Sequence, residues 1–415
     1  MKILQVISYF APRWGGDVSV CYNLSRELAE LGHEVTIITT DYNYDPDYAQ
    51  SLENVEVIPF RRVANLGLFL YSPGMKRWLR SNISNYDLVH LHSFRSYQNN
   101  IVCKYAMEFD VPYIVQPHGS FHGSLPRIVE RKGLKQPLKQ LYDLVWGYKI
   151  LRDAKAIIAL TSFEAEQAVT MGVKENKIHI IANGVDLSQW ENVSSEGEFR
   201  AQYNIPSTMH VILYLGRLHP IKGVDLLIRA FGIVSMERDD CILVVAGPDD
   251  GSLADLEKMT KELNLCGKVI FTGSLYGKDK FAAYCDSDIY VLPSYYDTFP
   301  MTILEAWAFK KPVIVTENCG IKDLVQDCGM VTRLNPYDLA NALQEYLQHD
   351  SLRHYHGLNG YNKLNKSLSL QATVENVENL YREVIKSNNM RRFAVEPSVT
   401  GFAERDRCLT GKPGK

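Results

Sequence analysis

Residues 293–320, PSYYDTFPMTILEAWAFKKPVIVTENCG, decide the fold that the sequence predicts. The apolar run immediately before them, 288–292, predicts a buried parallel strand that ends at the Pro-Ser pair. Pro300 predicts the start of a helix, since proline is tolerated at a first helical position, and Pro312 ends that helix. A further apolar run at 312–316 predicts the next strand. This order places a helix N-terminus at the carboxyl ends of parallel strands, where open α/β sheets bind ligands.

Two carboxylates, Asp297 and Glu305, bracket this turn. Glu305 shares a helix face with Met301 and Thr302, because residues three and four apart are neighbours on a helix. The first free N–H groups of the helix, near Met301 and Thr302, suit a phosphate oxygen, whereas the natural partners of the acids are hydroxyls. The pattern predicts a nucleotide-sugar, with sugar hydroxyls on one acid and ribose hydroxyls on the other. The alternative is a solvated loop acid beside a helix-surface acid.

A second strand-to-helix turn carries two cations between glycines. It reads GRLHPIKG (216–223) and follows an apolar run at 211–215. Arginine binds a phosphate bidentately and lysine binds it as a point charge, so Arg217 and Lys222 predict a pyrophosphate cradle. Two solvated surface cations are the alternative. The turn is not a P-loop, because no Ser or Thr follows the lysine.

The first half of the chain predicts a doubly wound sheet of its own. Its first strand is expected at 2–10, before a loop that carries Gly15 and Gly16 and a helix that follows. Paired glycines before a helix let a backbone approach a ligand closely, although a plain tight turn would use them as well. His118 follows a predicted strand, at the sheet edge where ligands bind. Further strands are expected at 34–40, 55–60, 87–92, 113–116, 156–160 and 177–181.

Composition excludes several classes of function. The 415 residues allow two or three domains, and a net charge of −3 does not call for a nucleic-acid partner. Eight scattered cysteines without a CxxC pair or zinc spacing favour a reducing cytoplasm. A DxD pattern, Asp286-Ser287-Asp288, falls at a helix-to-strand junction away from the ligand end of the sheet. We therefore expect neither a metal nor another cofactor.

Two segments, 67–83 and 127–155, combine basic with apolar side chains. The second carries eight basic and three acidic residues. Basic amphipathic helices can lie on anionic membranes, so either segment could hold the protein peripherally at the inner face of a membrane. The alternative is an ordinary surface helix that packs its apolar side on the sheet. No apolar run approaches the roughly 18 residues of a membrane span.

The stretch 293–320 resembles the retaining glycosyltransferases of family 4, also called glycosyltransferase group 1, which have the GT-B fold. Their signature is Glu, any residue, Phe and Gly, then a helix with a second Glu eight positions after the first. This chain matches it with Asp297, Phe299, Pro300 and Glu305. Asp297 is one methylene shorter than the glutamate, and Pro300 replaces a glycine and has no N–H to donate.

The resemblance covers about residues 1–387 and implies two Rossmann-like, doubly wound parallel-sheet domains that face a central cleft. In this fold the last helix crosses back onto the first domain. Polar, aperiodic composition marks a linker and a tail that we expect to be disordered. The expected boundaries are 1–190 for the acceptor-side domain, 191–208 for the linker, 209–370 for the nucleotide-sugar domain, 371–388 for the returning helix and 389–415 for the tail.

The resemblance also assigns roles. In the family the first acid contacts the donor sugar, the second holds the ribose, and a histidine lies near the outer hydroxyls of the sugar. The family's Arg and Lys hold the donor diphosphate, and backbone groups after a strand hold the base. The implied catalytic residues are His118, Arg217, Lys222 and Asp297, and the implied donor-binding residues are Gly15, Gly16, Arg217, Lys222, Gly273, Ser274, Leu275, Phe299, Met301, Thr302 and Glu305.

The reaction that this resemblance implies is transfer of a sugar from a UDP- or GDP-sugar to an acceptor hydroxyl, with retention of anomeric configuration. The acceptor would be a sugar or a lipid-linked molecule, in surface-polysaccharide or glycolipid synthesis. One alternative is a nucleotide-sugar epimerase of the same fold, which the Arg217 and Lys222 loop speaks against. The other is an inactive sugar-nucleotide binding module, which only the departures at Asp297 and Pro300 support.

Overall fold

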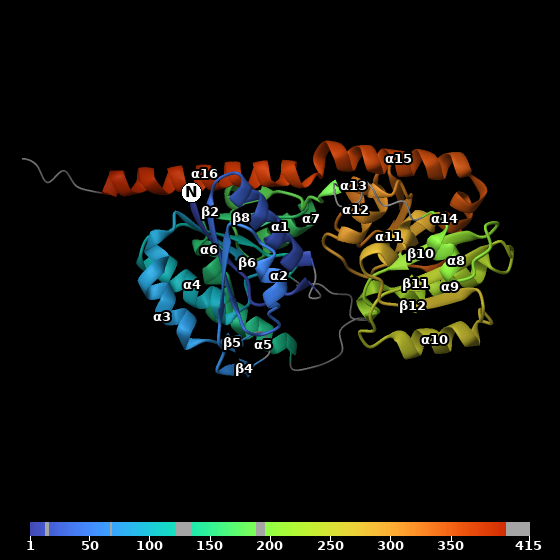
Figure 1. Ribbon diagram of the computed structural model, residues 1–415, viewed down its shortest axis with the longest axis horizontal. Helices are drawn as coiled ribbons and strands as arrows, with labels where there is room; N and C mark the ends of the chain where they lie inside the picture. Colours follow the sequence, from blue (N-terminus) through green and yellow to red (C-terminus); the bar gives the residue numbers. More distant parts are fainter. Residues whose placement is uncertain (13–15, 67–68, 122–134, 188–195, 396–415) are drawn as a thin grey trace, which may run out of the picture.

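The computed structural model describes residues 1–12, 16–66, 69–121, 135–187 and 196–395. Two lobes lie side by side, each built on a parallel sheet covered by helices (Figure 1). The predicted fold class, two doubly wound α/β domains, is confirmed. Gly15 lies outside the described residues, as do 67–68 and 127–134 of the two basic segments.

The first lobe contains a seven-stranded sheet of order β3-β2-β1-β6-β7-β8-β9. The order reverses between β1 and β6, which makes this edge the switch point where α/β sheets bind ligands. β1 ends at Val6 and not at Phe10 as predicted, because Phe10 leaves the sheet and its N–H donates to the Asn43 carbonyl. The strands are β1 Lys2–Val6, β2 Glu34–Thr40, β3 Val55–Phe60, β6 Leu88–His92, β7 Tyr113–Gln116, β8 Ala156–Ala159 and β9 Ile178–Ile180, and a hairpin of β4 Ala64–Leu66 with β5 Phe69–Tyr71 stands apart.

Helices on both faces bury the apolar side chains of this sheet. A π-helical turn, Asp143–Gly147, joins two of them into one continuous segment. The helices are α1 Gly16–Glu30, α2 Pro46–Gln50, α3 Pro73–Asn82, α4 Tyr97–Glu108, α5 Lys135–Tyr142, α6 Tyr148–Asp153 and α7 Ser162–Thr170.

The second lobe contains a six-stranded parallel sheet of order β12-β11-β10-β13-β14-β15. Its switch point lies between β10 and β13, the strands that precede the two turns singled out by the sequence. The strands are β10 His210–Leu215, β11 Cys241–Ala246, β12 Val269–Gly273, β13 Ile289–Leu292, β14 Val313–Thr316 and β15 Gly329–Thr332. The helices are α8 Glu198–Gln202, α9 Val224–Val234, α10 Leu253–Glu262, α11 Gly277–Asp286, α12 Met301–Ala308, α13 Lys322–Val325, α14 Pro336–Gln348 and α15 Asp350–Ser367.

Part of the expected linker is structured. Helix α8 begins after Gly197, and Phe199 and Ile205 are buried in the core of the second lobe. Asp286 accepts hydrogen bonds from the N–H groups of Gly197 and Arg200, at 2.6 and 3.0 Å. The first aspartate of the DxD pattern thus caps a helix, which is a structural role.

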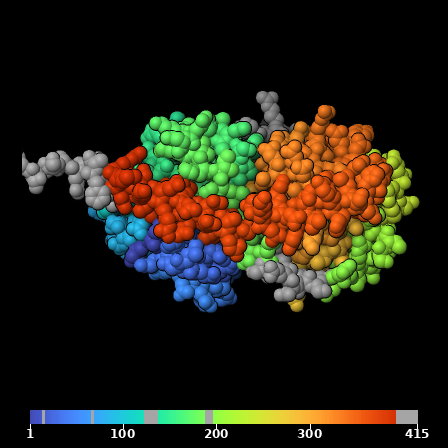
Figure 2. All heavy atoms as spheres, turned by 90° about the horizontal axis from the view of Figure 1, so that it is seen from above, coloured from blue at the N-terminus to red at the C-terminus, as the bar shows by residue number. Residues whose placement is uncertain are grey.

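The last helix, α16 Leu370–Val395, leaves the second lobe and runs along the first (Figures 1 and 2). It is continuous beyond the expected end at 388, so residues 389–395 are helical and the prediction of disorder was wrong for them. The Asn388 side-chain amide donates to the Asp110 carbonyl at 3.1 Å, which holds this end of the helix on the first lobe. Residues 396–415 lie outside the described residues. The buried stripe of α16 is Leu370, Val374, Val377, Leu380, Tyr381 and Val384.

Among the helices that the structure describes, none is long and apolar enough to cross a bilayer.

Candidate functional site

The turn between β13 and α12 lies where the sequence predicted it. The helix begins at Met301 rather than at Pro300, which has an extended backbone with ψ of 109° and forms the N-cap. The loop before it is held by the Asp297 carbonyl, which accepts from the Gly320 N–H at 2.7 Å. The first N–H groups of α12 therefore stand at the carboxyl edge of the sheet, as a phosphate site needs.

Lys222 and Asp297 form an ion pair with a nitrogen–oxygen distance of 2.5 Å. Both side chains are largely buried, at 20% and 13% exposed. The pair joins the two ligand turns of the second lobe, and a backbone hydrogen bond from Tyr295 N–H to the Ile221 carbonyl, at 2.9 Å, supports the contact. Two residues predicted to serve one ligand, 75 positions apart in the chain, are therefore in direct contact.

Both carboxylate oxygens of Glu305 contact side chains of helix α11. One carboxylate oxygen contacts Lys280 at 2.9 Å, and the other accepts from the Tyr284 hydroxyl, also at 2.9 Å. Burial and the neighbouring Glu305 carboxylate raise the pKa of Tyr284 well above its usual value, so this hydroxyl keeps its proton. Sequence reasoning missed Lys280 and Tyr284, although their spacing of four residues on a predicted helix was a signal that they share a face.

Arg217 pairs with Asp250 at 2.5 Å and is 61% exposed. It therefore lies at the solvent side of the turn, and its guanidinium can exchange this carboxylate for a phosphate at little cost, since exposed ion pairs are weak. The Tyr214 hydroxyl donates to the Arg217 carbonyl at 2.8 Å and fixes the backbone beneath it.

The other predicted donor residues of this lobe line the same edge. Gly273 ends β12 with a left-handed φ of 72°, and its carbonyl accepts from the Gly247 N–H at 2.8 Å. Ser274 is exposed, whereas Leu275 and Phe299 are buried.

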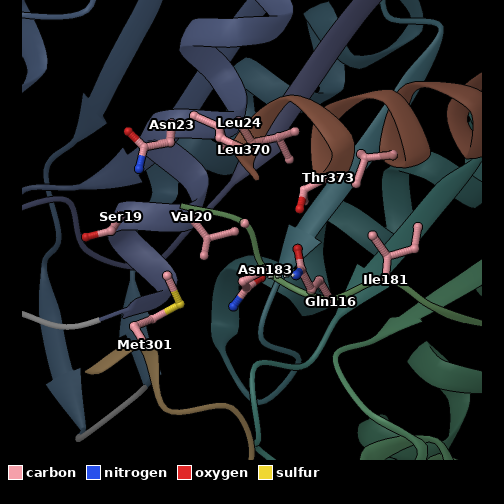
Figure 3. Close-up of a pocket in the computed structure, with 12 residues that line it drawn as sticks. Ser19, Val20, Asn23, Leu24, Gln116, Ile181, Asn183, Met301, Leu370 and Thr373 are labelled. Atoms are coloured by element: carbon pink, nitrogen blue, oxygen red, sulfur yellow. Dashed lines mark hydrogen bonds between the residues drawn. The ribbon is translucent and has the colours of Figure 1, made fainter. Parts of the chain in front are cut away.

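The start of α12 faces the first lobe. Met301 points toward α1, beside Val20 (Figure 3). A side chain added at Gly16, the first residue of α1, would meet Met301 Cγ at 3.7 Å. The second predicted glycine of the paired turn thus lies next to the predicted phosphate site.

His118 lies on a strained loop that reaches the second lobe. Its φ is 52° and that of Gly119 is 75°, and a side chain at Gly119 would come within 2.6 Å of Thr298 Oγ1. Thr298 follows Asp297 directly, so the loop of His118 lies against the residue next to the Lys222–Asp297 pair, across the two lobes. Burial lowers the pKa of His118 to about 3, so its imidazole is neutral and suits a sugar hydroxyl.

Glu164 holds this loop and was not found from the sequence. It is fully buried, and its carboxylate accepts from the Gly119 N–H at 2.5 Å and from the Leu160 N–H at 2.8 Å. Burial raises its pKa to about 7. A lone glutamate on a helix carries no sequence signal for this role, because its partners are backbone groups.

Two family models match the chain and together cover most of it. Residues 14–189 match the model described as Glycosyltransferase Family 4, and residues 195–363 match the model described as Glycosyl transferases group 1. This chain is a family 4 glycosyltransferase. Enzymatic glycosyl transfer is thereby established as its activity, and the recognised resemblance is confirmed.

Similar proteins match more than nine-tenths of this glycosyltransferase. A Methanocaldococcus jannaschii protein, named as an uncharacterised glycosyltransferase, is 26% identical over 92% of this chain and 98% of its own length. The alpha-monoglucosyldiacylglycerol synthase of Streptococcus pneumoniae is 27% identical over 94% of this chain and 88% of its own length. The crystal structure of Anabaena HepE in complex with UDP and glucose has a TM-score of 0.74 at 18% identity, covering 92% of this chain and all of HepE. This structural match establishes the GT-B fold.

Proposed function

We propose that this glycosyltransferase moves a sugar from a UDP- or GDP-sugar to an acceptor hydroxyl and retains the anomeric configuration. The observation that carries the proposal is the Lys222–Asp297 pair at the N-terminus of α12, opposite the His118 loop of the other lobe. A diphosphate placed between them would meet a lysine and free helix N–H groups, and its sugar would meet a carboxylate and a neutral imidazole.

Each group has a distinct task in this proposal. Lys222, Arg217 and the N–H groups at the start of α12 stabilise the charge that develops on the departing diphosphate. Glu305, oriented by Lys280 and Tyr284, accepts hydrogen bonds from the ribose hydroxyls.

The bond changes are limited to the donor and acceptor. The bond between the anomeric carbon and the diphosphate oxygen breaks, and the acceptor oxygen bonds to that carbon on the same face. The proton of the acceptor hydroxyl moves to the departing phosphate oxygen.

Gly16 and the backbone at Gly273 to Leu275 complete the proposed donor site. The backbone at Gly273 to Leu275 would contact the base.

The acceptor is proposed to bind in a polar cavity of the first lobe. The cavity lies at the carboxyl ends of β1 and β6, and His92 and Lys139 of helix α5 line it. Arg95 lines it, and Asp17 accepts from the Tyr9 hydroxyl at 3.0 Å. Burial raises the pKa of Asp17. Its carboxyl can form a hydrogen bond with an acceptor hydroxyl.

A donor panel tests the function. The purified chain is incubated without added metal against UDP-, GDP- and ADP-sugars, and release of free nucleotide is followed. We expect slow release from one UDP- or GDP-sugar and loss of that release in Glu305→Ala. An epimerised donor without nucleotide release would support the epimerase alternative. Binding of a donor without release, in the presence of sugar and lipid acceptors, would support the inactive module, and failure to bind any nucleotide would overturn the proposal.

A lipid-linked acceptor is favoured by a surface patch next to the acceptor cavity. Helix α5 and the π-helical turn expose the apolar side chains of this patch, whereas Met75 and Leu79 of α3 are buried in the lobe core. Of the two basic segments, the structure therefore favours 135–153 over 67–83. The patch consists of Leu138, Leu141, Leu144, Val145 and Trp146, which are between 43% and 73% exposed.

A buried ion pair anchors the helical segment that bears the patch, and basic side chains are exposed on the same segment. Arg95 donates to both carboxylate oxygens of Asp143 at 2.8 and 2.7 Å, and both side chains are only 10% exposed. Lys149 and Arg152 are exposed on the same segment. We propose that this patch contacts an anionic bilayer that contains the acceptor.

Vesicle sedimentation tests the patch. Leu141→Ser with Leu144→Ser is expected to weaken binding to phosphatidylglycerol-containing vesicles about tenfold or more, since each leucine contributes ~1.5–3 kcal/mol when it leaves water. Donor hydrolysis should not change. Met236→Ser with Leu263→Ser, two exposed apolar residues of the second lobe, is the matched control. Equal vesicle binding by wild type and the patch variant would rule out this surface.

A further inference from the structure

A chain of buried hydrogen bonds connects the returning helix α16 to His118. The Tyr381 hydroxyl lies 2.7 Å from His90 Nδ1 and accepts from Gln5 Nε2 at 3.3 Å. Gln5 Oε1 lies 2.9 Å from His92 Nε2, and His92 Nδ1 lies 2.8 Å from His118 Nε2. Gln5, His90, His92 and Tyr381 are each at most 2% exposed. Four segments far apart in the sequence thus share one buried polar network.

The amide of Gln5 determines where the protons of this network lie. An amide oxygen can only accept, so His92 Nε2 must donate to Gln5 Oε1. Burial keeps the pKa of His92 well below its usual value, so the ring is neutral and its Nδ1 is an acceptor. His118 Nε2 must then donate to His92 Nδ1. The lone pair of His118 is left on Nδ1.

The Tyr381 hydroxyl supplies the hydrogen-bond acceptor for the N–H of that amide. Gln5 Nε2 donates to the Tyr381 oxygen, and the tyrosine proton goes to His90 Nδ1, so the hydroxyl both accepts and donates a hydrogen bond. Without the hydroxyl, the Gln5 amide could turn over and present Nε2 to His92. Both His92 and His118 would then have to move their protons to Nδ1, because each hydrogen bond in the chain would reverse.

We infer that Tyr381 is a positioning residue, which through Gln5 and His92 holds His118 as the Nε2–H tautomer and keeps its Nδ1 lone pair available to a donor-sugar hydroxyl. This inference rests on the proposed function for the role of His118, but not for its tautomer. Its consequence is that α16 does more than pack on the first lobe: docking of this helix sets the chemical state of a site residue.

The tautomers can be measured without any substrate. Protein labelled with ¹⁵N in histidine is examined by long-range ¹H–¹⁵N correlation, with single His→Gln variants for assignment. We expect His92 and His118 of the wild type to carry their protons on Nε2. In Tyr381→Phe we expect signals of the Nδ1–H form to appear for both rings. Because the wild-type spectrum alone tests the tautomer, the inference stays open to refutation even if the variant folds poorly.

A matched control is Tyr346→Phe, which removes another buried tyrosine hydroxyl that contacts a histidine, His356 Nδ1 at 2.8 Å, in the second lobe. It should leave the His92 and His118 signals unchanged. Once a donor is known, kcat of Tyr381→Phe should fall roughly two- to tenfold with little change in donor KM, in keeping with loss of one hydrogen bond. A wild-type His118 protonated on Nδ1, or His92 and His118 signals unaffected by Tyr381→Phe, would overturn the inference. Failure of the donor panel together with the expected tautomers would refute the proposed function alone.

Discussion

Replacing Lys222 with alanine is expected to lower kcat for donor turnover by roughly 100- to 1000-fold, the usual effect of removing one preorganised group that stabilises developing charge. Lys222 lies in the turn before α9 and is largely buried, and its partner Asp297, in the loop before α12, is only 13% exposed. A lysine in such a place attracts a diphosphate more strongly as negative charge accumulates on the leaving oxygen. The effect should therefore fall on kcat more than on donor KM, measured by initial rates across donor concentrations.

Lys268→Ala is the matched control for this experiment. Lys268 also forms an ion pair, with Asp239 at 2.6 Å, and its side chain is 33% exposed in the same lobe. It lies outside both ligand turns, so its removal should leave kcat unchanged. If Lys222→Ala kept more than a tenth of the wild-type kcat while folding normally, the lysine would be a structural partner of Asp297 and the diphosphate would bind elsewhere.

The loops of the site could be located from the sequence because their signals are local. Two of these signals are patterns of residues close together in the chain: the glycines that flank Arg217 and Lys222, and the strand-loop-helix order around Asp297. Most strand limits followed from apolar runs. The structure added what holds these loops. Glu164 binds backbone N–H groups and Lys280 neutralises Glu305, and neither contact leaves a periodic pattern. Tyr381 could not be found from a local pattern, because it contacts Gln5 across 376 positions of sequence.

The errors in element limits have a similar origin. Apolar residues up to Phe10 predicted a longer first strand, but the backbone of Phe10 pairs with the loop at Asn43 instead of with the sheet. Polar composition predicted disorder at 389–395, yet the docked part of α16 supplies a formed helix onto which each further residue adds one hydrogen bond. Polar composition also led to the prediction of a linker at 191–208, although two apolar residues of that region, Phe199 and Ile205, are buried in the core of the second lobe.

Gly223→Ala is expected to lower the stability of the fold by several kcal/mol, about the sum of left-handed strain and overpacking, and to abolish donor binding with it. Gly223 is the left-handed N-cap of α9, with φ of 67°, and closes the Lys222 turn. An alanine Cβ would stand 2.0 Å from the Pro293 carbonyl oxygen, which is backbone and cannot rotate away. Either the turn moves away from the loop after β13, and this movement separates Lys222 from Asp297, or the strained contact remains. Left-handed strain costs about 1–2 kcal/mol and overpacking adds about 1–3 kcal/mol.

Gly267→Ala separates these two contributions. Gly267 lies before β12 with φ of 83°, and within the described ranges no atom lies within 4 Å of the position that its Cβ would occupy. Its replacement should therefore cost only the left-handed strain, about 1–2 kcal/mol, and leave nucleotide binding intact. Thermal melting and nucleotide titration of both variants give the comparison. Equal loss of stability in the two would mean that the β13 loop yields freely to Gly223→Ala. Nucleotide affinity that survives Gly223→Ala would mean that the contact between the two turns does not position Lys222, because the close approach of their backbones is what brings the lysine to Asp297.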